Sequence, residues 1–276
     1  MKKFLKTSNR ASGETTATVS PVHAAGQVPF LFKQPAMVRL TGQTLRPGGL
    51  HLTDRAVDFC GFAAGDRVLD AGCGYGVTGR YLSDEFGIRV VGIDISIDRA
   101  VDRNKRHGTG RPSSVFPELV QARIPGLPFG EDTFKGIFCE CVFSLVQEKS
   151  HSLGEFYRIL RPGGHLVLSD LYIPEKYLSA VRQYQGDGPF TSCMEGAMGI
   201  IDLIRLLENA GFTITLMEDH TRFLKQLAGQ IVFEYGSLDR FWDALPGAAG
   251  CGHLTHMCRT GSLKLGYGLF VATKYH

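Results

Sequence analysis

Residues 67–76 combine residue types and a spacing that suit the binding of a nucleotide-like ligand. The stretch reads RVLDAGCGYG, a short apolar run that ends in Asp70 and is followed by a glycine at every second position. These glycines are Gly72, Gly74 and Gly76, with Cys73 between the first two. Glycine adopts backbone conformations closed to other residues and lets a ligand approach the main chain without a Cβ in the way. The stretch therefore predicts a buried strand, a tight turn and the start of a helix whose free N–H groups face a ligand.

A second acid, Asp94, follows another apolar run 18 residues after Gly76. Residues 89–96 read RVVGIDIS, which predicts a strand that ends at this acid. A carboxylate in that place can hold the hydroxyl groups of a ribose. The fingerprint of dinucleotide-binding proteins needs a further glycine where this chain has Val77, so that ligand class fails on spacing. The two stretches together indicate a nucleoside-containing ligand without a pyrophosphate.

Four motifs in order along the chain resemble those of the class I S-adenosylmethionine-dependent methyltransferases. They are Val68–Gly76 with Asp94, Leu127–Phe129 with Phe134 downstream, Ile137–Glu140, and Leu160–Gly164. The resemblance covers residues 45–275 and is to the small-molecule group of type 11, which is similar to enzymes of ubiquinone and menaquinone biosynthesis. Residues 45–53 also resemble the stretch before the first strand in a subgroup of bacterial methyltransferases.

The resemblance implies a fold and a domain organisation. The expected fold is α/β, with a doubly wound, mostly parallel, seven-stranded, Rossmann-like sheet and helical insertions. A chain of 276 residues with 43% hydrophobic residues is long enough for one such domain. We predict a flexible tail at residues 1–27 and a methyltransferase domain at residues 28–276, with insertions at about 173–195 and 221–262.

The composition argues against several other classes of protein. The net charge of +3 comes from 30 basic and 27 acidic residues without a long basic run, so nothing indicates nucleic acid or an anionic membrane as a partner. No run of 18 apolar residues is present, and Met1 is not followed by the apolar stretch of a secretory signal. We therefore predict a cytoplasmic protein that acts on a small molecule. The cysteines number seven, an odd count that predicts free thiols rather than a disulfide framework.

Apolar periodicity, with glycine and proline between the runs, predicts the remaining elements. Before the first strand, Thr53 is expected to cap a helix over residues 54–60. Helices are predicted at 98–107, 153–160 and 200–210, the second of them ended by Pro162–Gly164. Strands are predicted at 118–122, 134–142, 165–172 and 212–217. Residues 265–274 are expected to form the reversed last strand that is typical of the family.

The resemblance also implies which residues contact the cofactor, S-adenosyl-L-methionine. They are Asp70, Gly72, Cys73, Gly74, Gly76, Asp94, Ile95, Arg123, Ile124 and Cys139. Asp70 is expected to act indirectly by ordering the glycine turn, whereas Asp94 should touch the ribose directly.

Arg123 departs from the pattern of the family. The family usually carries an acid four residues before the Leu of its "LPF" motif, where it binds the adenine amine, and here that position holds Arg123. An arginine cannot accept a hydrogen bond. Either a backbone group near Arg123 and Ile124 reads the adenine, or the guanidinium stacks on the base or faces away.

Methyl transfer from a sulfonium is an in-line displacement, so its main requirement is a dry pocket that holds nucleophile and methyl close and aligned. A base is needed only when the acceptor must lose a proton. Glu140 and His220 are the candidate bases, because both follow strands whose carboxyl ends should border the pocket. The alternatives are that Glu140 binds the amino group of the cofactor and that His220 caps the helix after it.

The acceptor is expected to be a small, largely apolar organic molecule. The 173–195 loop should close its pocket, and Phe223, Leu227, Phe241 and Trp242 of the second insertion could supply apolar walls. The alternative for these residues is that they form core, which is the more common role of such an apolar stripe. One alternative is an arsenite methyltransferase, in which Cys139 and Cys141, two apart on one strand, face the same side and bind the metalloid as thiolates. Another is a non-catalytic protein that binds the cofactor as a sensor or scaffold. No metal ligands are predicted for a resident ion.

Overall fold

The computed structural model describes residues 32, 34–98, 100–101, 118–182, 190, 192–245 and 253–276. The tail predicted at residues 1–27 lies outside the described residues. So does most of the helix predicted at residues 98–107, and so does part of the predicted 173–195 loop.

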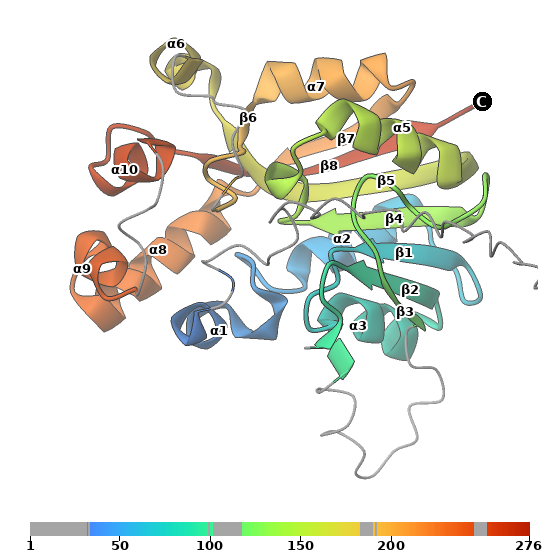
Figure 1. Ribbon diagram of the computed structural model, residues 1–276, viewed down its shortest axis with the longest axis horizontal. Helices are drawn as coiled ribbons and strands as arrows, with labels where there is room; N and C mark the ends of the chain where they lie inside the picture. The colour runs from blue at the N-terminus through green and yellow to red at the C-terminus, as the bar shows by residue number, and fades with distance from the viewer. Residues whose placement is uncertain are drawn as a thin grey trace, which may run out of the picture.

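A single sheet with helices on both faces forms the body of the molecule (Figure 1). Its strands are β1 (Arg67–Ala71), β2 (Arg89–Asp94), β3 (Glu118–Gln121), β4 (Phe134–Glu140), β5 (Leu160–Ile173), β6 (Met198–Gly199), β7 (Thr213–Asp219) and β8 (Gly266–Lys274). The order is β3-β2-β1-β4-β5-β8-β7, and the two-residue β6 pairs with β5 off this path. The pairs from β3 to β5 are parallel, while β8 runs antiparallel to β5 and β7. The doubly wound, mostly parallel sheet and the reversed last strand are thus confirmed.

Alternate residues of the inner strands pack on opposite faces of the sheet. Val68, Phe138 and Val167 join one core cluster, which includes apolar residues of α2 (His51–Cys60) and α3 (Val77–Phe86). Leu69, Ile137 and Leu166 join the other, which includes residues of α5 (Lys149–Ile159) and α7 (Ile200–Asn209). This period of two follows from the pleat of a strand, and burial on both faces explains why these strands read as nearly continuous apolar runs.

The second predicted insertion forms helices at one end of the sheet. They are α8 (Thr221–Tyr235), α9 (Leu238–Asp243) and α10 (His253–Arg259), drawn in orange and red at the left of Figure 1 beside α1 (Pro35–Thr41). A short helix, α6 (Leu178–Val181), follows β5. None of the helices in the described ranges is long and apolar enough to cross a membrane. The cytoplasmic location stays a prediction.

Two predicted helix boundaries are wrong, and in both cases a long-range contact decides the observed one. Helix α2 already begins at His51, so Thr53 lies inside the helix, fully buried, and its hydroxyl donates to Glu140 instead of capping the helix. Helix α5 ends at Ile159, and Leu160 already pairs with Phe134 as the first residue of β5. Pro162–Gly164 therefore lie within the strand and do not end the helix.

Candidate active site

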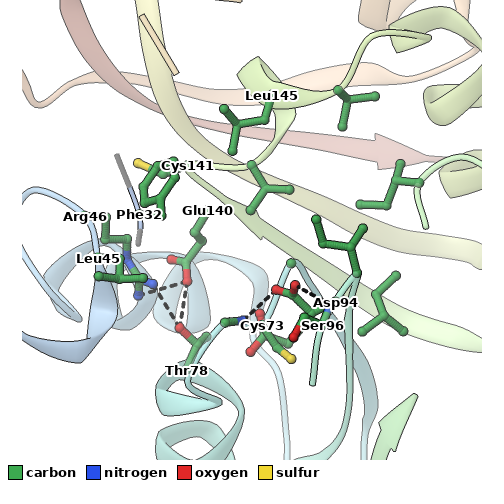
Figure 2. A pocket seen from close by; sticks show the side chains of 18 of the residues that line it. Phe32, Leu45, Arg46, Cys73, Thr78, Asp94, Ser96, Glu140, Cys141 and Leu145 are labelled. Carbon is green, nitrogen blue, oxygen red and sulfur yellow. Dashed lines mark hydrogen bonds and ion pairs between the residues drawn. The ribbon is translucent and has the colours of Figure 1, made fainter. Parts of the chain in front are cut away.

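A cavity of about 270 Å³ opens at the carboxyl ends of β1, β2 and β4. This is where the strand order reverses, because β2 and β3 lie on one side of β1 and β4 lies on the other. Ligands of open α/β sheets bind at such switch points. The lining consists of Phe32, Gln43–Arg46, Asp70, Gly72–Tyr75, Val77, Thr78, Ile93–Ser96, Ala122–Pro125, Glu140–Val142, Leu145–Glu148 and Phe190. Figure 2 shows the side chains that converge on it.

The glycine turn forms one wall of the cavity. The amides of Gly72 and Cys73 both donate to the carbonyl of Ile93, which ties the turn to β2. Gly72 has φ of 81°, and a Cβ on it would lie 2.4 Å from a methyl group of Val142. Gly76 has φ of 68° and is the residue before the first turn of α3, so it shapes the turn without lining the cavity. The turn therefore needs glycine for both its conformation and its packing.

Asp70 anchors the helix that follows this turn. Its Oδ2 accepts a hydrogen bond from the amide of Gly79, in the first turns of α3, at 3.2 Å. Burial, and secondarily the nearby carboxylate of Glu140, raises the pKa of Asp70 to about 7. This hydrogen bond thus ties the end of β1 to the start of α3 at the base of the cavity.

Asp94 lies half-buried at the end of β2 and faces the cavity. One carboxylate oxygen accepts from the amide of Gly74 at 2.9 Å, and the other accepts from the amide of Ser96 at 3.1 Å (Figure 2). Both oxygens of the carboxylate are thus bonded to backbone amides at the edge of the cavity. The pair of backbone bonds fixes the orientation of the carboxylate at the cavity.

The chain after β3 continues the cavity wall beside Asp94. Gln121 is the register partner of Asp94, and the amide of Ala122 donates to the carbonyl of Asp94 at 3.0 Å. Arg123 and Ile124 follow and line the cavity, with the Arg123 side chain exposed.

Glu140 lies at the other end, inside a buried ring of hydrogen bonds. Its Oε2 is 2.9 Å from Nη2 of Arg46, and both side chains are at most 5% exposed. The hydroxyl of Thr53 donates to Oε1 and that of Thr78 donates to Oε2, each at 3.0 Å. Arg46 in turn donates to both hydroxyls and to the carbonyl of Gly49. Figure 2 shows part of this ring between the segment before α2 and the start of α3.

Asp170 holds the segment after β4 in place through hydrogen bonds. Its two carboxylate oxygens accept from the amide and the hydroxyl of Ser144, both at 2.8 Å, and the amide of Leu171 adds a third bond. Burial raises the pKa of Asp170 to about 6. The neighbouring residues Leu145 and Val146 line the cavity, so this carboxyl group positions part of its apolar wall.

The structure brings most of the predicted site residues together and leaves three outside the cavity lining. Inside are Asp70, Gly72, Cys73, Gly74, Asp94, Ile95, Arg123, Ile124 and Glu140. Gly76 acts through conformation alone, and Cys139 is buried in the core on the α5 and α7 face of the sheet. His220 is absent from the lining because its Nε2 lies 2.9 Å from Glu218 and its ring stacks on Phe223.

The prediction that Cys139 and Cys141 face the same side of one strand is wrong. The strand ends at Glu140, and Cys141 takes φ of 55°, which turns its side chain toward the opposite core cluster and the cavity. Burial raises the pKa of both Cys139 and Cys141, so neither is poised as a thiolate. Across the described part of the chain, no group of three or more metal-ligating side chains is found, and the six cysteines there are free thiols.

The predicted apolar walls from the second insertion are also wrong for this cavity. Leu227, Phe241 and Trp242 form a separate core cluster with Met37 and Leu40 of α1. The insertion therefore supports α1 and, through it, the segment that carries Arg46.

Sequence reasoning missed Arg46, Thr78 and the aromatic side chains of Phe32 and Phe190. The only available signal was a charged residue directly before the Pro47–Gly49 turn, where a loop would not require one. Its partner Glu140 lies too far along the chain for any local pattern to connect the two.

Comparisons with known proteins agree with this geometry. A family model described as a methyltransferase domain matches residues 69–168. The phosphoethanolamine N-methyltransferase of Triticum aestivum is 30% identical over 199 residues, which are 70% of this chain and 37% of that protein. The arsenite methyltransferase of Halobacterium salinarum is 29% identical over 171 residues, which are 60% of this chain and 43% of that protein. The chain thus spans less than half the length of these relatives.

A solved structure extends the match to the fold as a whole. Phosphoethanolamine N-methyltransferase 2 of Haemonchus contortus, in complex with S-adenosyl-L-methionine, aligns with a TM-score of 0.64 at 18% identity. The alignment covers 87% of this chain and 56% of that one.

The residues present fit S-adenosylmethionine. A Cβ on Gly74 would meet nothing within 4 Å, so a ligand has room to approach the main chain there. The carboxylate of Asp94 lies beside this space and suits a ribose diol. Val77 stands where the dinucleotide fingerprint has its third glycine, so a pyrophosphate is not expected. Over residues 69–168 the chain therefore carries a methyltransferase domain of the type 11 group, with the class I fold of S-adenosylmethionine-dependent methyltransferases.

Proposed function

We propose that the chain transfers a methyl group from S-adenosylmethionine to a small, largely apolar organic acceptor by in-line displacement. One observation carries the proposal. The cavity has a polar nucleoside-binding end at Asp94 and the glycine turn, and it continues into a wall of Phe32, Leu45, Leu145 and Val146. Apolar walls of this kind exclude water and align an organic acceptor.

The bound cofactor supplies an electrophilic methyl group, whose bond to sulfur breaks as the acceptor atom bonds the carbon, leaving the electron pair on sulfur. The protein has little covalent chemistry to do in such a step and contributes position and electrostatics. Asp94 and the glycine turn hold the nucleoside, and Asp70 keeps α3 against β1 beneath it.

In this proposal, the role of Glu140 is to place a negative charge at the cavity. Arg46, Thr53 and Thr78 all donate to its carboxylate, and Arg46 supplies the opposite charge. Its Oε1 accepts from Thr53 and keeps room for one more donor, such as an ammonium group of the ligand. We propose no general base role for His220, because it contacts Glu218 outside the cavity lining.

The charges of the cavity bear on the acceptor class. Among the described lining residues the only basic side chains are Arg46, which is paired with Glu140, and Arg123. A phosphate-bearing acceptor would need more unpaired positive charge than this. The thiols with raised pKa likewise disfavour arsenite as the acceptor.

The test combines binding with product identification. Calorimetry with S-adenosylmethionine and S-adenosylhomocysteine should show binding of both, and a metabolite extract incubated with methyl-labelled cofactor should yield a labelled small molecule identified by mass spectrometry. Labelled RNA or protein, with small molecules unlabelled, would contradict the acceptor class. Cofactor binding without transfer to any extract component would favour the non-catalytic alternative, and methylated arsenic from arsenite would favour the thiolate alternative.

A further inference from the structure

Arg123 lies at the end of the cavity where the base of the cofactor must go. Asp94 marks the ribose, and one side of its carboxylate is occupied by the glycine turn through the amide of Gly74. Its other oxygen accepts from the amide of Ser96. The segment Ala122–Pro125 follows the register partner of Asp94, is bonded to the Asp94 carbonyl through the amide of Ala122, and lines the cavity. A purine attached to a ribose at Asp94 therefore extends toward this segment.

The side chains of this segment offer no acceptor to the exocyclic amine of adenine, although Arg123 can donate to the ring nitrogens of the base. The exocyclic amine of adenine is a hydrogen-bond donor, and a guanidinium carries five donors and no acceptor. The carboxylates in the described lining are Asp70, Asp94, Glu140 and Glu148, none of which belongs to the segment after β3. The side chain at the place where a base-reading acceptor would be useful can therefore only donate.

A 6-keto purine presents the complementary chemistry. Its O6 is an acceptor, so a guanidinium can donate to it, whereas a carboxylate in the same place would repel it. The Arg123 side chain is exposed and lines the cavity, so it can turn toward the base edge without giving up a buried partner.

We propose that Arg123 sets a relaxed base specificity in this cavity, so that it accepts nucleoside ligands with a 6-keto purine about as well as those with adenine. The inference rests on the proposed cofactor site and adds the class of base that the site admits. Arg123 is a specificity-determining residue in this account, and it takes no part in the transfer of the methyl group.

Two thioethers that differ only in the base test the proposal by calorimetry. They are S-adenosylhomocysteine and its deaminated counterpart S-inosylhomocysteine. The unmodified protein should bind both with dissociation constants within about threefold of each other. Arg123→Asp should favour the adenine form by at least about tenfold, since a carboxylate accepts from the amine and repels the keto oxygen. The matched control Arg205→Asp changes the same charge on the exposed face of α7 and should leave the ratio unchanged.

The outcomes separate this inference from the proposed function. If the unmodified protein prefers the adenine form by more than about thirtyfold, or if Arg123→Asp leaves the ratio unchanged, the base assignment is wrong while the cofactor site stands. Absence of binding by both thioethers to the unmodified protein would overturn the cofactor site itself, and the inference with it.

Discussion

The two ends of the cavity are built in different ways. The nucleoside end consists of the glycine turn at residues 72–76 and Asp94, and backbone amides of this turn bond to β2 and to Asp94. The other end, which holds Glu140 and is called the closing end below, is a ring of side chains from four separate segments of the chain. They are Arg46, Thr53, Thr78 and Glu140, and Thr53 and Glu140 are 87 positions apart. Figure 2 shows both ends. Backbone conformation therefore determines one end and long-range side-chain pairing determines the other, so substitutions should affect them differently.

The largest effect is expected at the closing end, from removing one partner of its buried ion pair. Glu140→Leu leaves the Arg46 guanidinium buried without its counter-charge, which should lower the free energy of unfolding by about 3–5 kcal/mol in urea titrations. The double variant Arg46→Met with Glu140→Leu should lose less than Glu140→Leu alone, because no unpaired charge remains. If the double variant loses as much as the two single variants together, Arg46 and Glu140 are not coupled and the closing end is not built as described.

At the nucleoside end, the backbone should be the sensitive part. Gly72→Ala adds a Cβ 2.4 Å from a methyl group of Val142 at φ of 81°, so it should cost about 3 kcal/mol of unfolding free energy. Gly74→Ala is the matched control, since its φ is 53° but its Cβ meets nothing within 4 Å. It should cost about 1–2 kcal/mol.

Equal losses in the two glycine variants would mean that crowding against Val142 does not matter. Adding Val142→Ala to Gly72→Ala should then restore nothing, whereas the packing account expects partial recovery.

Asp94 tests whether the nucleoside end binds its ligand through this carboxylate. Asp94→Ala should weaken the binding of S-adenosylhomocysteine by about 1–3 kcal/mol in calorimetry, because the ribose loses an acceptor and the amides of Gly74 and Ser96 lose theirs. Glu208→Ala, on the exposed side of α7, is the control. An unchanged affinity in a folded Asp94→Ala protein would place the ribose elsewhere.

The smallest expected effect is a change in pH dependence at Asp70, which lies between the two ends. Burial raises its pKa from 3.8 to about 7, so the folded protein binds a proton that the unfolded chain releases. The resulting stabilisation is complete below about pH 4 and is lost as the pH rises through about 7. The free energy of unfolding should therefore fall between about pH 4 and about pH 7, and Asp70→Asn should reduce that fall by about 1 kcal/mol or more.

Asp170, whose pKa burial raises to about 6, remains in this variant, so part of the pH dependence should persist. Parallel stability profiles of the unmodified protein and Asp70→Asn in urea titrations would show that Asp70 does not take up the proton.

The sequence by itself determined the nucleoside end and most of the sheet. The spacing of Gly72, Gly74 and Gly76 reports backbone conformations that other residues avoid, and the three have φ of 81°, 53° and 68°. Apolar runs that end in acids located β1 and β2, and the run at residues 265–274 located the reversed strand β8. These features are local, because each follows from the conformational or burial preference of neighbouring residues.

Only the tertiary structure decided the closing end. The local sequence predicts Thr53 as a helix cap, yet it lies inside α2 and its hydroxyl bonds to Glu140. Cys141 does not share the face of Cys139, because the strand has already ended. Phe241 and Trp242 have an apolar pattern that suits a pocket wall as well as a core, and packing against α1 selects the core. The residue type and the local sequence pattern indicate that a side chain must be buried or paired. Its partner depends on which distant segments the fold brings within hydrogen-bonding or packing distance.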